Sequence, residues 1–543
     1  KTSIGSKTSS SEARDSSPAA RRGSRSVERS ARGRACSGMG DAAASGEGTS
    51  LINALDRRRG GARAAAYGEP VDLHLRRFTY PASACIFLNT IVGPGIVSLP
   101  KIYQRVGWFI PSICLIVGSV MTAIATLIWC DLVASIPGNE TFARNIKFCD
   151  PFDYYIGRRA YVAAHVFFYC SATSVIMSSI APVAEASDIA LSAVFGTTYG
   201  VSFDYSTGIP AFQRWRFLEC EIKQPCEPFY TGSGDKFQHA FLITFGYVLT
   251  TLLLLPWCYL NLDEGMPLQW LSLLTMAVTV GVMIYSSATE PLTGTPIVTE
   301  NFDTYMKVPG TVAFNQMYGI FLCAWLIEKH PGVDVPKLIW PTTSIATGIF
   351  VIFGIVCSLV ERDLSYNIIT DFTQRGRGTV LFVSALAFEW VVLASGVPVV
   401  AVTLRRNLEK AKLGGVQDFA AFLGCIAPFL LAWIFYRSNA LGHLITYSGL
   451  FFVGWLLLVA PYFVQLCAYN PLPAEPSFRT MGAWFASHWV VSESLLHHAT
   501  VRPIPHWALH PKYHRPLYAF LLVLSASALL LTALFTFSPS ASR

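Results

Sequence analysis

Charged residues are scarce in this chain. Asp, Glu, Lys and Arg make up 14% of its 543 residues, whereas a soluble globular domain carries about 25%. Hydrophobic residues make up 52%, and they gather in runs of about 20 residues, the length that crosses a bilayer core as a helix. The composition therefore excludes a soluble globular protein and predicts an all-α polytopic membrane protein.

Several motifs are also missing. The chain has no Gly-x-x-x-x-Gly-Lys-Ser/Thr loop to hold nucleotide phosphates, which argues against an ATP-driven pump. No span carries an Arg at every third position, as a voltage sensor does. The strand alternation of a membrane β-barrel is absent. Three classes remain: a secondary active transporter, a membrane-bound sensor and a membrane enzyme.

The apolar runs predict eleven transmembrane helices in a five-plus-five arrangement followed by one extra helix. The ten-helix core covers residues 80–465, a loop covers 466–515, and the eleventh helix lies within 516–543. The third span is overlong and contains Pro182, which predicts that its outer end bends away from the membrane. The predicted spans cover residues 82–104, 107–134, 160–190, 237–257, 267–288, 311–328, 338–360, 378–403, 416–436, 441–464 and 516–537.

Basic residues concentrate at the N-terminal end. Residues 1–79 hold 15 of the 41 Lys and Arg residues and are rich in Ser, Ala and Gly, which predicts a disordered basic tail. The positive-inside rule places this tail and the loop 466–515 in the cytoplasm, with the C-terminus outside. The plasma membrane and the vacuolar or lysosomal membrane both fit. An Arg-rich tail also suits nucleic acid, but a polytopic chain favours the lipid bilayer as its partner.

The first span contains the triplet Gly93-Pro94-Gly95 near its centre. Pro94 has no N–H and clashes with the preceding turn, and glycine is a poor helix former. Hydrocarbon cannot satisfy the freed backbone groups, so a broken span survives only where it lines a cavity or is covered by protein. The triplet predicts a broken helix at a binding site, the alternative being a kink that only shapes packing.

The sixth span has a similar interruption. Asn315, Gln316 and Gly319 bring polar and Gly residues into its middle. The first and sixth spans occupy equivalent places if spans 1–5 and 6–10 are inverted repeats. Paired interruptions in matching positions of two halves are typical of the substrate site of secondary transporters.

The run from Asn89 to Pro100 (Asn-Thr-Ile-Val-Gly-Pro-Gly-Ile-Val-Ser-Leu-Pro), followed by Gly107-Trp108, resembles the opening of the amino acid/auxin permease family, within the amino acid–polyamine–organocation superfamily. Two further stretches support the resemblance, residues 395–400 leading into 405–408, and residues 336–340. The resemblance covers about 80–465. It implies inverted repeats with broken helices 1 and 6, alternating access, and amino acid transport driven by protons or sodium.

The chain departs from the family's pattern in two places. Pro94 replaces the small residue that usually separates the two glycines. Sodium-coupled members present a polar side chain in span one, matched by Asn89, and a hydroxyl in span eight. Ser395 lies near that second position, but Gly396 stands where the hydroxyl is expected. The resemblance therefore implies a symporter coupled to protons more readily than to sodium.

An amino acid substrate brings a carboxylate and an ammonium group. N–H groups at the start of the outer half of span one, near Ile96, suit the carboxylate, because they carry the positive end of the helix dipole. The carbonyls of Thr90, Ile91 and Val92 suit the ammonium. No charged side chain lies within the break, which favours neutral amino acids. Tyr318, Phe321 and Cys323 of span six are predicted to line the opposite wall, or else to be plain core residues.

Glu389 is the acid deepest inside an apolar span. An ionised carboxylate costs several kcal/mol there, so it has to be protonated, paired or hydrated. We interpret Glu389 as a candidate proton carrier, the alternative being a structural Glu that bonds a neighbouring helix. Asp131, Glu185 and Asp188 lie nearer the ends of their spans and are interpreted as gate or interfacial residues.

Two of the thirteen cysteines, Cys220 and Cys226, lie close together in a polar loop. They form a disulfide if that loop faces an oxidising compartment, and two unpaired thiols otherwise. Most of the others lie in apolar spans and are interpreted as core residues.

Histidines cluster late in the chain. His506, His510 and His514 recur every four residues, a spacing that suits a metal site on one helix face. Pro505 and Pro511 interrupt that helix, however, so a metal-dependent membrane enzyme is the least favoured class. No metal and no cofactor are expected, apart from the coupling ion. A sensor that binds amino acids and signals through the basic tail is the other alternative.

Overall fold

The computed structural model describes residues 78–536, apart from residues 205–209, 221–227, 230–239, 261, 263, 293–296, 299–304, 306, 361–362, 375, 437, 470–477, 488–503 and 505–512. All described residues belong to the unit that spans residues 61–543. The predicted tail therefore lies outside the described residues, except for its last two positions, and so does most of the predicted loop 466–515.

Eleven apolar helical segments occur among the described residues. Nine of them are long enough to cross a membrane, and two shorter ones, Phe245–Tyr259 and Phe422–Phe435, stand where the fourth and ninth spans are predicted. The prediction of an all-α polytopic membrane protein is confirmed. The nine long spans are Tyr80–Val106, Phe109–Ala134, Arg158–Phe195, Met266–Ala288, Val308–Glu328, Val335–Ser358, Thr379–Glu409, Leu441–Tyr469 and His514–Leu534.

Each set of five spans begins with a broken helix. Span 1 consists of α2 (Tyr80–Ile91), a 3₁₀ turn (Pro94–Ser98) and α3 (Leu99–Val106). Span 6 consists of α10 (Val308–Asn315), a 3₁₀ turn (Met317–Phe321) and α11 (Leu322–Glu328). Both predicted interruptions are therefore confirmed.

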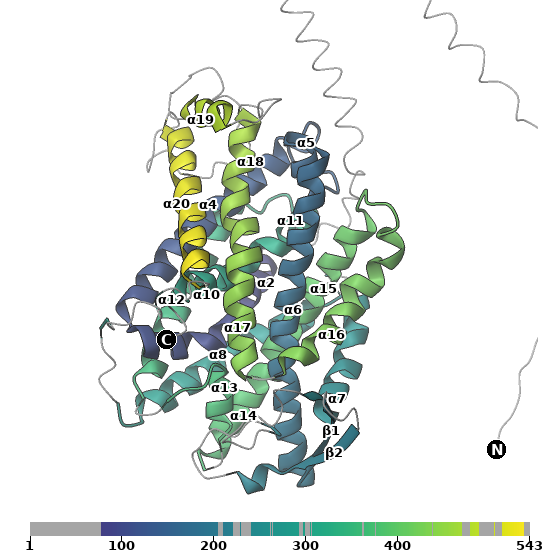
Figure 1. The fold of residues 1–543 in the computed structure, drawn as a ribbon, viewed down its shortest axis with the longest axis vertical. Helices are drawn as coiled ribbons and strands as arrows, with labels where there is room; N and C mark the ends of the chain where they lie inside the picture. The colour runs from purple at the N-terminus through teal and green to yellow at the C-terminus, as the bar shows by residue number, and fades with distance from the viewer. Residues whose placement is uncertain are drawn as a thin grey trace, which may run out of the picture. The chain divides into compact units, whose positions relative to one another are not determined.

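The remaining elements follow in chain order (Figure 1). Spans 2 to 5 are α4 (Phe109–Ala134), α6 (Arg158–Phe195), α7 (Phe245–Leu254) with a 3₁₀ extension to Tyr259, and α8 (Met266–Ala288), and the short helix α5 (Asp150–Tyr155) precedes α6. Spans 7 to 9 are α12 (Val335–Ser358), α14 (Thr379–Ala387) continued by a π-helical segment (Phe388–Leu393) and α15 (Ala394–Glu409), and a π-helical segment (Phe422–Ile426) leading into α16 (Ala427–Ala432). Spans 10 and 11 are α17 (Ser438–Ser448) with α18 (Ala460–Tyr469), and α20 (His514–Thr536); α13 (Ile368–Phe372) and α19 (Phe478–Ser487) lie in loops.

The third span is a single long helix, and the bend predicted at Pro182 stays a prediction. The helix α6 is continuous over 38 residues and is not interrupted at Pro182. Its last turns carry a small antiparallel sheet that the sequence does not reveal, with strand order β2-β1-β3. The strands are β1 (Thr198–Asp204), β2 (Pro210–Trp215) and β3 (Ala240–Thr244). The fourth span accordingly begins at Phe245, because the residues just before it form β3.

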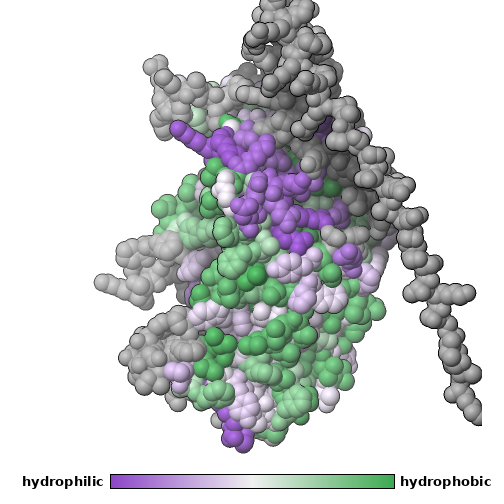
Figure 2. All heavy atoms as spheres, turned by 90° about the vertical axis from the view of Figure 1, so that its right-hand side faces the viewer, coloured by the Kyte–Doolittle hydropathy of each residue, from purple (hydrophilic) through white to green (hydrophobic). Residues whose placement is uncertain are grey.

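Segments predicted to face opposite sides of the membrane lie at opposite ends of the helix bundle. In Figure 1, α5 and α19 lie at the upper end, whereas β1, β2 and α7 lie at the lower end. Figure 2 shows hydrophilic side chains gathered toward the upper end of one face, above a broad hydrophobic band. Large apolar side chains such as Ile116, Leu274 and Leu534 are exposed along the spans, as expected for a lipid-facing surface. Which end faces the cytoplasm stays a prediction.

The backbones of spans 6 and 10 touch where two glycines meet. A Cβ on Gly449 would lie 1.9 Å from the carbonyl oxygen of Gly310, and a Cβ on Gly310 would lie 2.3 Å from that of Thr446. Small residues allow such close approach between membrane helices. This crossing holds α10, the N-terminal half of span 6, against α17.

We expect Gly449→Ala to destabilise the protein by about 1–3 kcal/mol, because the new methyl group meets backbone atoms that have no room to move. Thermal unfolding of the purified protein in detergent measures the loss. Gly348→Ala in α12 is the matched control, since no atom lies within 4 Å of the Cβ it would add. Equal melting temperatures for the two variants would contradict the close crossing.

Candidate functional site

The first break lies between Ile91 and Pro94. The helix α2 ends at Ile91, and Val92 (φ −78°, ψ 39°) and Gly93 (φ −82°, ψ −145°) leave the helical region. Because Pro94 has no N–H, it cannot donate a hydrogen bond to a carbonyl in the preceding turn of α2, and the regular helix is interrupted at this position. The chain then re-enters the span through a 3₁₀ turn whose residues are all buried.

The second break lies at Gln316. The helix α10 ends at Asn315, Gln316 adopts φ −102° and ψ 25°, and a 3₁₀ turn follows. All residues from Thr311 to Phe321 are buried, so this interruption is covered by protein, as the physics of a membrane interior requires.

The two breaks are in direct contact. A Cβ on Gly95 would lie 2.3 Å from Oδ1 of Asn315, and a Cβ on Gly93 would lie 3.5 Å from Cε of Met317. Gly95 is therefore required for a steric reason, since any side chain would displace the Asn315 carboxamide. The interrupted segments of spans 1 and 6 are therefore packed against each other.

Three carboxamide oxygens at the breaks are buried without a hydrogen-bond partner. They are Oδ1 of Asn89, Oδ1 of Asn315 and Oε1 of Gln316. A buried acceptor left unpaired costs about 1–3 kcal/mol. The three residues are at most 4% exposed, so the breaks hold acceptors that a ligand with N–H groups would satisfy.

The backbone groups predicted to bind substrate are partly engaged already. The N–H of Ile96 donates to the carbonyl of Gly93 at 3.3 Å, and the N–H of Val92 donates to that of Leu88 at 2.9 Å. The Thr90 hydroxyl donates to the carbonyl of Ile86 at 2.8 Å. The anion-binding role predicted for the N–H groups near Ile96 stays a prediction, and in this conformation the N–H of Ile96 itself is used within the turn.

Two of the three predicted residues of span 6 share an aromatic cluster. Phe87 of α2 lies 5.9 Å from Tyr318 and 4.8 Å from Phe321, measured between ring centroids, and Trp325 lies 5.1 Å from Phe87. The Tyr318 hydroxyl accepts from Thr343 of α12 at 3.3 Å. The third residue, Cys323, lies beside Trp129 of α4.

A residue that sequence reasoning missed joins Asn89 to Ser395. Asn89 donates through Nδ2 to the backbone carbonyl of Gln269 at 2.7 Å and to its Oε1 at 3.0 Å. Nε2 of Gln269 in turn donates to the carbonyl of Ser395 at 2.9 Å. The Ser395 hydroxyl donates to Val392 of its own helix. The buried carboxamide of Gln269 in α8 therefore bridges spans 1 and 8. The sequence feature that could have indicated Gln269 is a polar residue within an apolar span.

Glu389 lies in the π-helical segment of span 8 and is buried. Nδ2 of Asn367 lies 3.3 Å from its Oε1 and 3.2 Å from Oε2 of Glu185 in α6. Glu185, interpreted from sequence as a gate or interfacial residue, is thus joined to the proton-carrier candidate through one amide. Asn367 lies in a loop, and no sequence pattern around it predicts a contact with the two acids. π-Helical turns are frequent at functional sites.

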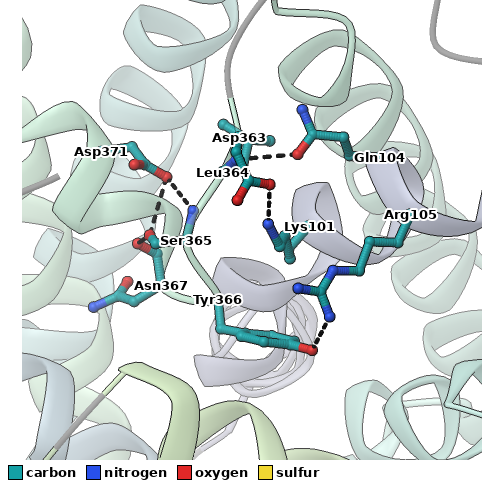
Figure 3. Close-up of polar contacts among 9 residues, drawn as sticks. All are labelled: Lys101, Gln104, Arg105, Asp363, Leu364, Ser365, Tyr366, Asn367 and Asp371. Atoms are coloured by element: carbon teal, nitrogen blue, oxygen red, sulfur yellow. Dashed lines mark hydrogen bonds and ion pairs between the residues drawn. The ribbon is translucent and has the colours of Figure 1, made fainter. Parts of the chain in front are cut away.

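The loop between spans 7 and 8 is fastened to α3, the C-terminal half of span 1 (Figure 3). We call residues 363–372 the strap. Lys101 pairs with Asp363, the side chain of Gln104 accepts from the N–H of Leu364 at 3.0 Å, and Arg105 donates to the Tyr366 hydroxyl at 2.7 Å. Three residues of α3 therefore hold three of the four strap residues that precede Asn367.

Polar contacts also join spans 1, 6 and 8 at the opposite end, the predicted cytoplasmic one. Arg406 of span 8 donates to Glu328 at the end of span 6 at 2.6 Å. The N–H of Phe78 donates to the carbonyl of Glu328, and the N–H of His330 donates to that of Phe78, at 3.2 and 3.0 Å. The start of span 1 is thus fixed to the end of span 6.

Lys147 lies near this closure, in the segment between spans 2 and 3. Burial lowers its pKa from the usual 10.5 to about 8, and the positive charge of Arg406 acts in the same direction. Burial also raises the pKa of Asp150, whose carboxylate accepts from the N–H of Lys147 at 2.7 Å. A lysine that releases its proton near neutral pH makes this end sensitive to pH.

Other predictions fall partly outside the described residues. Cys220 is disulfide-bonded, but Cys226 lies outside the described residues, so their pairing stays a prediction. His506 and His510 also lie outside, whereas His514 begins α20. Among the residues that the structure describes, no group of three His, Cys, Asp or Glu side chains is placed to hold a metal ion.

Comparisons with known proteins were made with the sequence and with the structure. No protein-family model and no curated protein matches the chain. Among solved structures, Mhp1, a nucleobase-cation-symport-1 family transporter with bromovinylhydantoin bound, matches with 11% identity and a TM-score of 0.48, over 88% of this chain and 98% of that one. A mutant of the Eremococcus coleocola manganese transporter matches with 13% identity and a TM-score of 0.42, over 84% and 94%. Such values are too low to identify a substrate.

The Lys147 site predicts a dependence of stability on pH. Between about pH 8 and 10.5 the folded protein has released this proton while the unfolded chain still binds it, so the free energy of unfolding rises with pH across that window. We expect Lys147→Met to remove this rise and to melt at a higher temperature than the wild type at pH 7. Melting temperatures measured from pH 7 to 10 test it, and parallel curves for both proteins would contradict the lowered pKa.

Proposed function

We propose that this protein is a secondary active transporter that moves neutral amino acids by alternating access, coupled to protons. The observation that carries the proposal is the contact between the two broken helices, where Gly95 meets Asn315 inside the membrane. A plain kink would explain either break alone. It does not explain why both breaks lie together and bring unpaired acceptors with them.

The substrate class follows from the groups at the breaks. The interrupted segments, residues 92–98 and 315–321, contain no charged side chain, so neither a cationic nor an anionic side chain of a substrate would find a counter-charge there. The unpaired oxygens of Asn89, Asn315 and Gln316 suit an ammonium group, which is a donor in all directions. The resemblance of residues 89–100 to amino acid/auxin permeases supports the same substrate class.

Alternating access requires a closure on each side of the site. The strap on α3 closes one end, and the ion pair between Arg406 and Glu328 closes the other. The strap holds span 1 through Lys101, and the other closure holds span 1 through Phe78 and span 6 through Glu328. A ligand that changes the angle between these helices can therefore release one closure while it tightens the other.

Proton coupling is favoured over sodium coupling by the surroundings of Ser395. Its carbonyl accepts the amide N–H of Gln269, so a sodium ion between spans 1 and 8 would have to share that oxygen with an N–H donor. Glu389 is the acid proposed to carry the proton, because it is buried in a span and its partner is a neutral amide.

The proposal is tested by counterflow of labelled neutral amino acids in proteoliposomes that contain the pure protein. We expect exchange by the wild type, and for Gly95→Ala a loss of about tenfold or more, because the new methyl group displaces Asn315. Gly281→Ala in α8 is the matched control, since nothing lies within 4 Å of its Cβ. Binding without exchange by the wild type would favour the amino acid sensor instead.

Proton coupling predicts a second result in the same vesicles. Glu389→Gln should exchange labelled substrate but should not respond to an inward proton gradient, because the carboxamide cannot bind and release a proton in this pH range. Uptake measured with and without a pH gradient, at constant sodium, gives the ratio to compare. A gradient response equal to that of the wild type would remove Glu389 as the carrier.

A further inference from the structure

Two buried carboxyl groups lie together between spans 3 and 8. Glu185 is 3% exposed and Glu389 is 2% exposed. A single nitrogen, Nδ2 of Asn367, lies 3.2 Å from Oε2 of Glu185 and 3.3 Å from Oε1 of Glu389. Two carboxylates so close to one donor, and so far from water, cannot both ionise at low cost.

The orientation of the Asn367 amide is fixed by its other end. Its Oδ1 accepts the N–H of Ile369 at 3.2 Å and so caps α13. The NH₂ group therefore has to face the two carboxyl groups. An N–H donor aimed at the site repels a metal cation, which takes oxygen ligands. The arrangement suits a proton held between two carboxyl groups and does not suit a sodium ion.

The other titratable groups around the pair are satisfied by their own partners. Asp188, one turn along α6, accepts from Thr198 at 2.7 Å, from the N–H of Gly246 at 2.9 Å and from the Tyr436 hydroxyl at 2.6 Å. Asp371 of the strap accepts from the N–H and hydroxyl of Ser365 and from Gln374.

The packed helices α8 and α14 contribute no charged side chain to the surroundings. The charged groups of α15, Arg405, Arg406 and Glu409, lie at its opposite end. The nearest carboxylates thus have donors of their own, whereas Glu185 and Glu389 both accept from the amide NH₂ of Asn367.

Asn367 is also part of the strap. The strap is fastened to α3 by Asp363, by the N–H of Leu364 and by Tyr366, and the Tyr366 ring rests against Gly442 of α17. The amide that bridges the two carboxyl groups therefore keeps its place only while the strap is closed on α3.

We infer that Glu185 and Glu389 form a shared proton site, and that Asn367 links the occupancy of this site to closure of the strap on α3. The second half rests on the proposed transport function. With a proton bound, the O–H of one carboxyl group donates to the other, and spans 3 and 8 are drawn together. When the proton leaves to solvent, two like charges face each other. Spans 3 and 8 separate, Asn367 loses one partner, and the strap releases α3.

Infrared spectroscopy of the purified protein tests the shared site without any transport assay. The measured quantity is the pH at which the C=O band of a protonated carboxyl group disappears. We expect Glu185→Gln and Glu389→Gln each to lower the proton affinity about tenfold or more, because each replaces a like charge by a neutral amide. The double variant should lack this component, and Glu140→Gln, an exposed acid at the other end, should match the wild type.

Two infrared outcomes would overturn the shared site. One is a wild-type spectrum that shows no component missing from the double variant. The other is a single variant that holds its proton as tightly as the wild type. Neither outcome depends on whether the protein transports anything, so a failure here is distinct from a failure of counterflow.

The link to the strap is tested with Asn367→Ser. Serine keeps a helix cap for α13 but is too short to bridge two carboxyl groups. We expect the ratio of proton-driven uptake to counterflow to fall about tenfold, whereas a purely structural role would lower both together. An unchanged ratio would overturn the link. If the wild type shows no counterflow, the transport proposal has failed, and the link with it.

Discussion

The polar groups of a peptide backbone cannot be left without partners inside a membrane, and the rest of this structure depends on that constraint. Gly93-Pro94-Gly95 frees backbone groups in the middle of span 1, so the break has to be covered by protein. The cover comes from the matching break in span 6, where Asn315 lies against Gly95. The helices of spans 3 and 8 also pack against the interrupted segments, and the more exposed spans 5, 7 and 11 face outward.

Much of the fold could be predicted from the sequence, because a span needs only length and hydrophobicity to be recognised. The eleven apolar runs correspond to the eleven apolar helical segments, and both breaks lie where Gly93-Pro94-Gly95 and the polar run after Asn315 indicate. The sheet β2-β1-β3 was missed because only β1 alternates, with Tyr199, Val201 and Phe203 between polar or small residues, and its partner strands β2 and β3 show no such pattern. The bend expected at Pro182 stays a prediction, although α6 continues through that residue.

The candidate site was predictable only in part. The sequence pattern indicated the interrupted backbone and the isolated acid Glu389, because a proline or a charged residue stands out within an apolar span. The partners were not predictable. Gln269 reaches Asn89 and Ser395 from a different helix, and Asn367 reaches Glu185 from 182 positions away in the chain. Such pairings depend on how helices rotate against each other, which no local pattern encodes.

The burial of span 6 has a consequence for how the protein is made. It is the least apolar and the most deeply buried of the nine long spans, and Asn315, which covers Gly95, is synthesised 220 positions after it. During synthesis, span 1 therefore enters the bilayer with unpaired backbone groups at its break. Spans 2 to 5 follow before span 6, which covers the break, is made. We expect cellular insertion factors to shield the break of span 1 from lipid until span 6 is inserted.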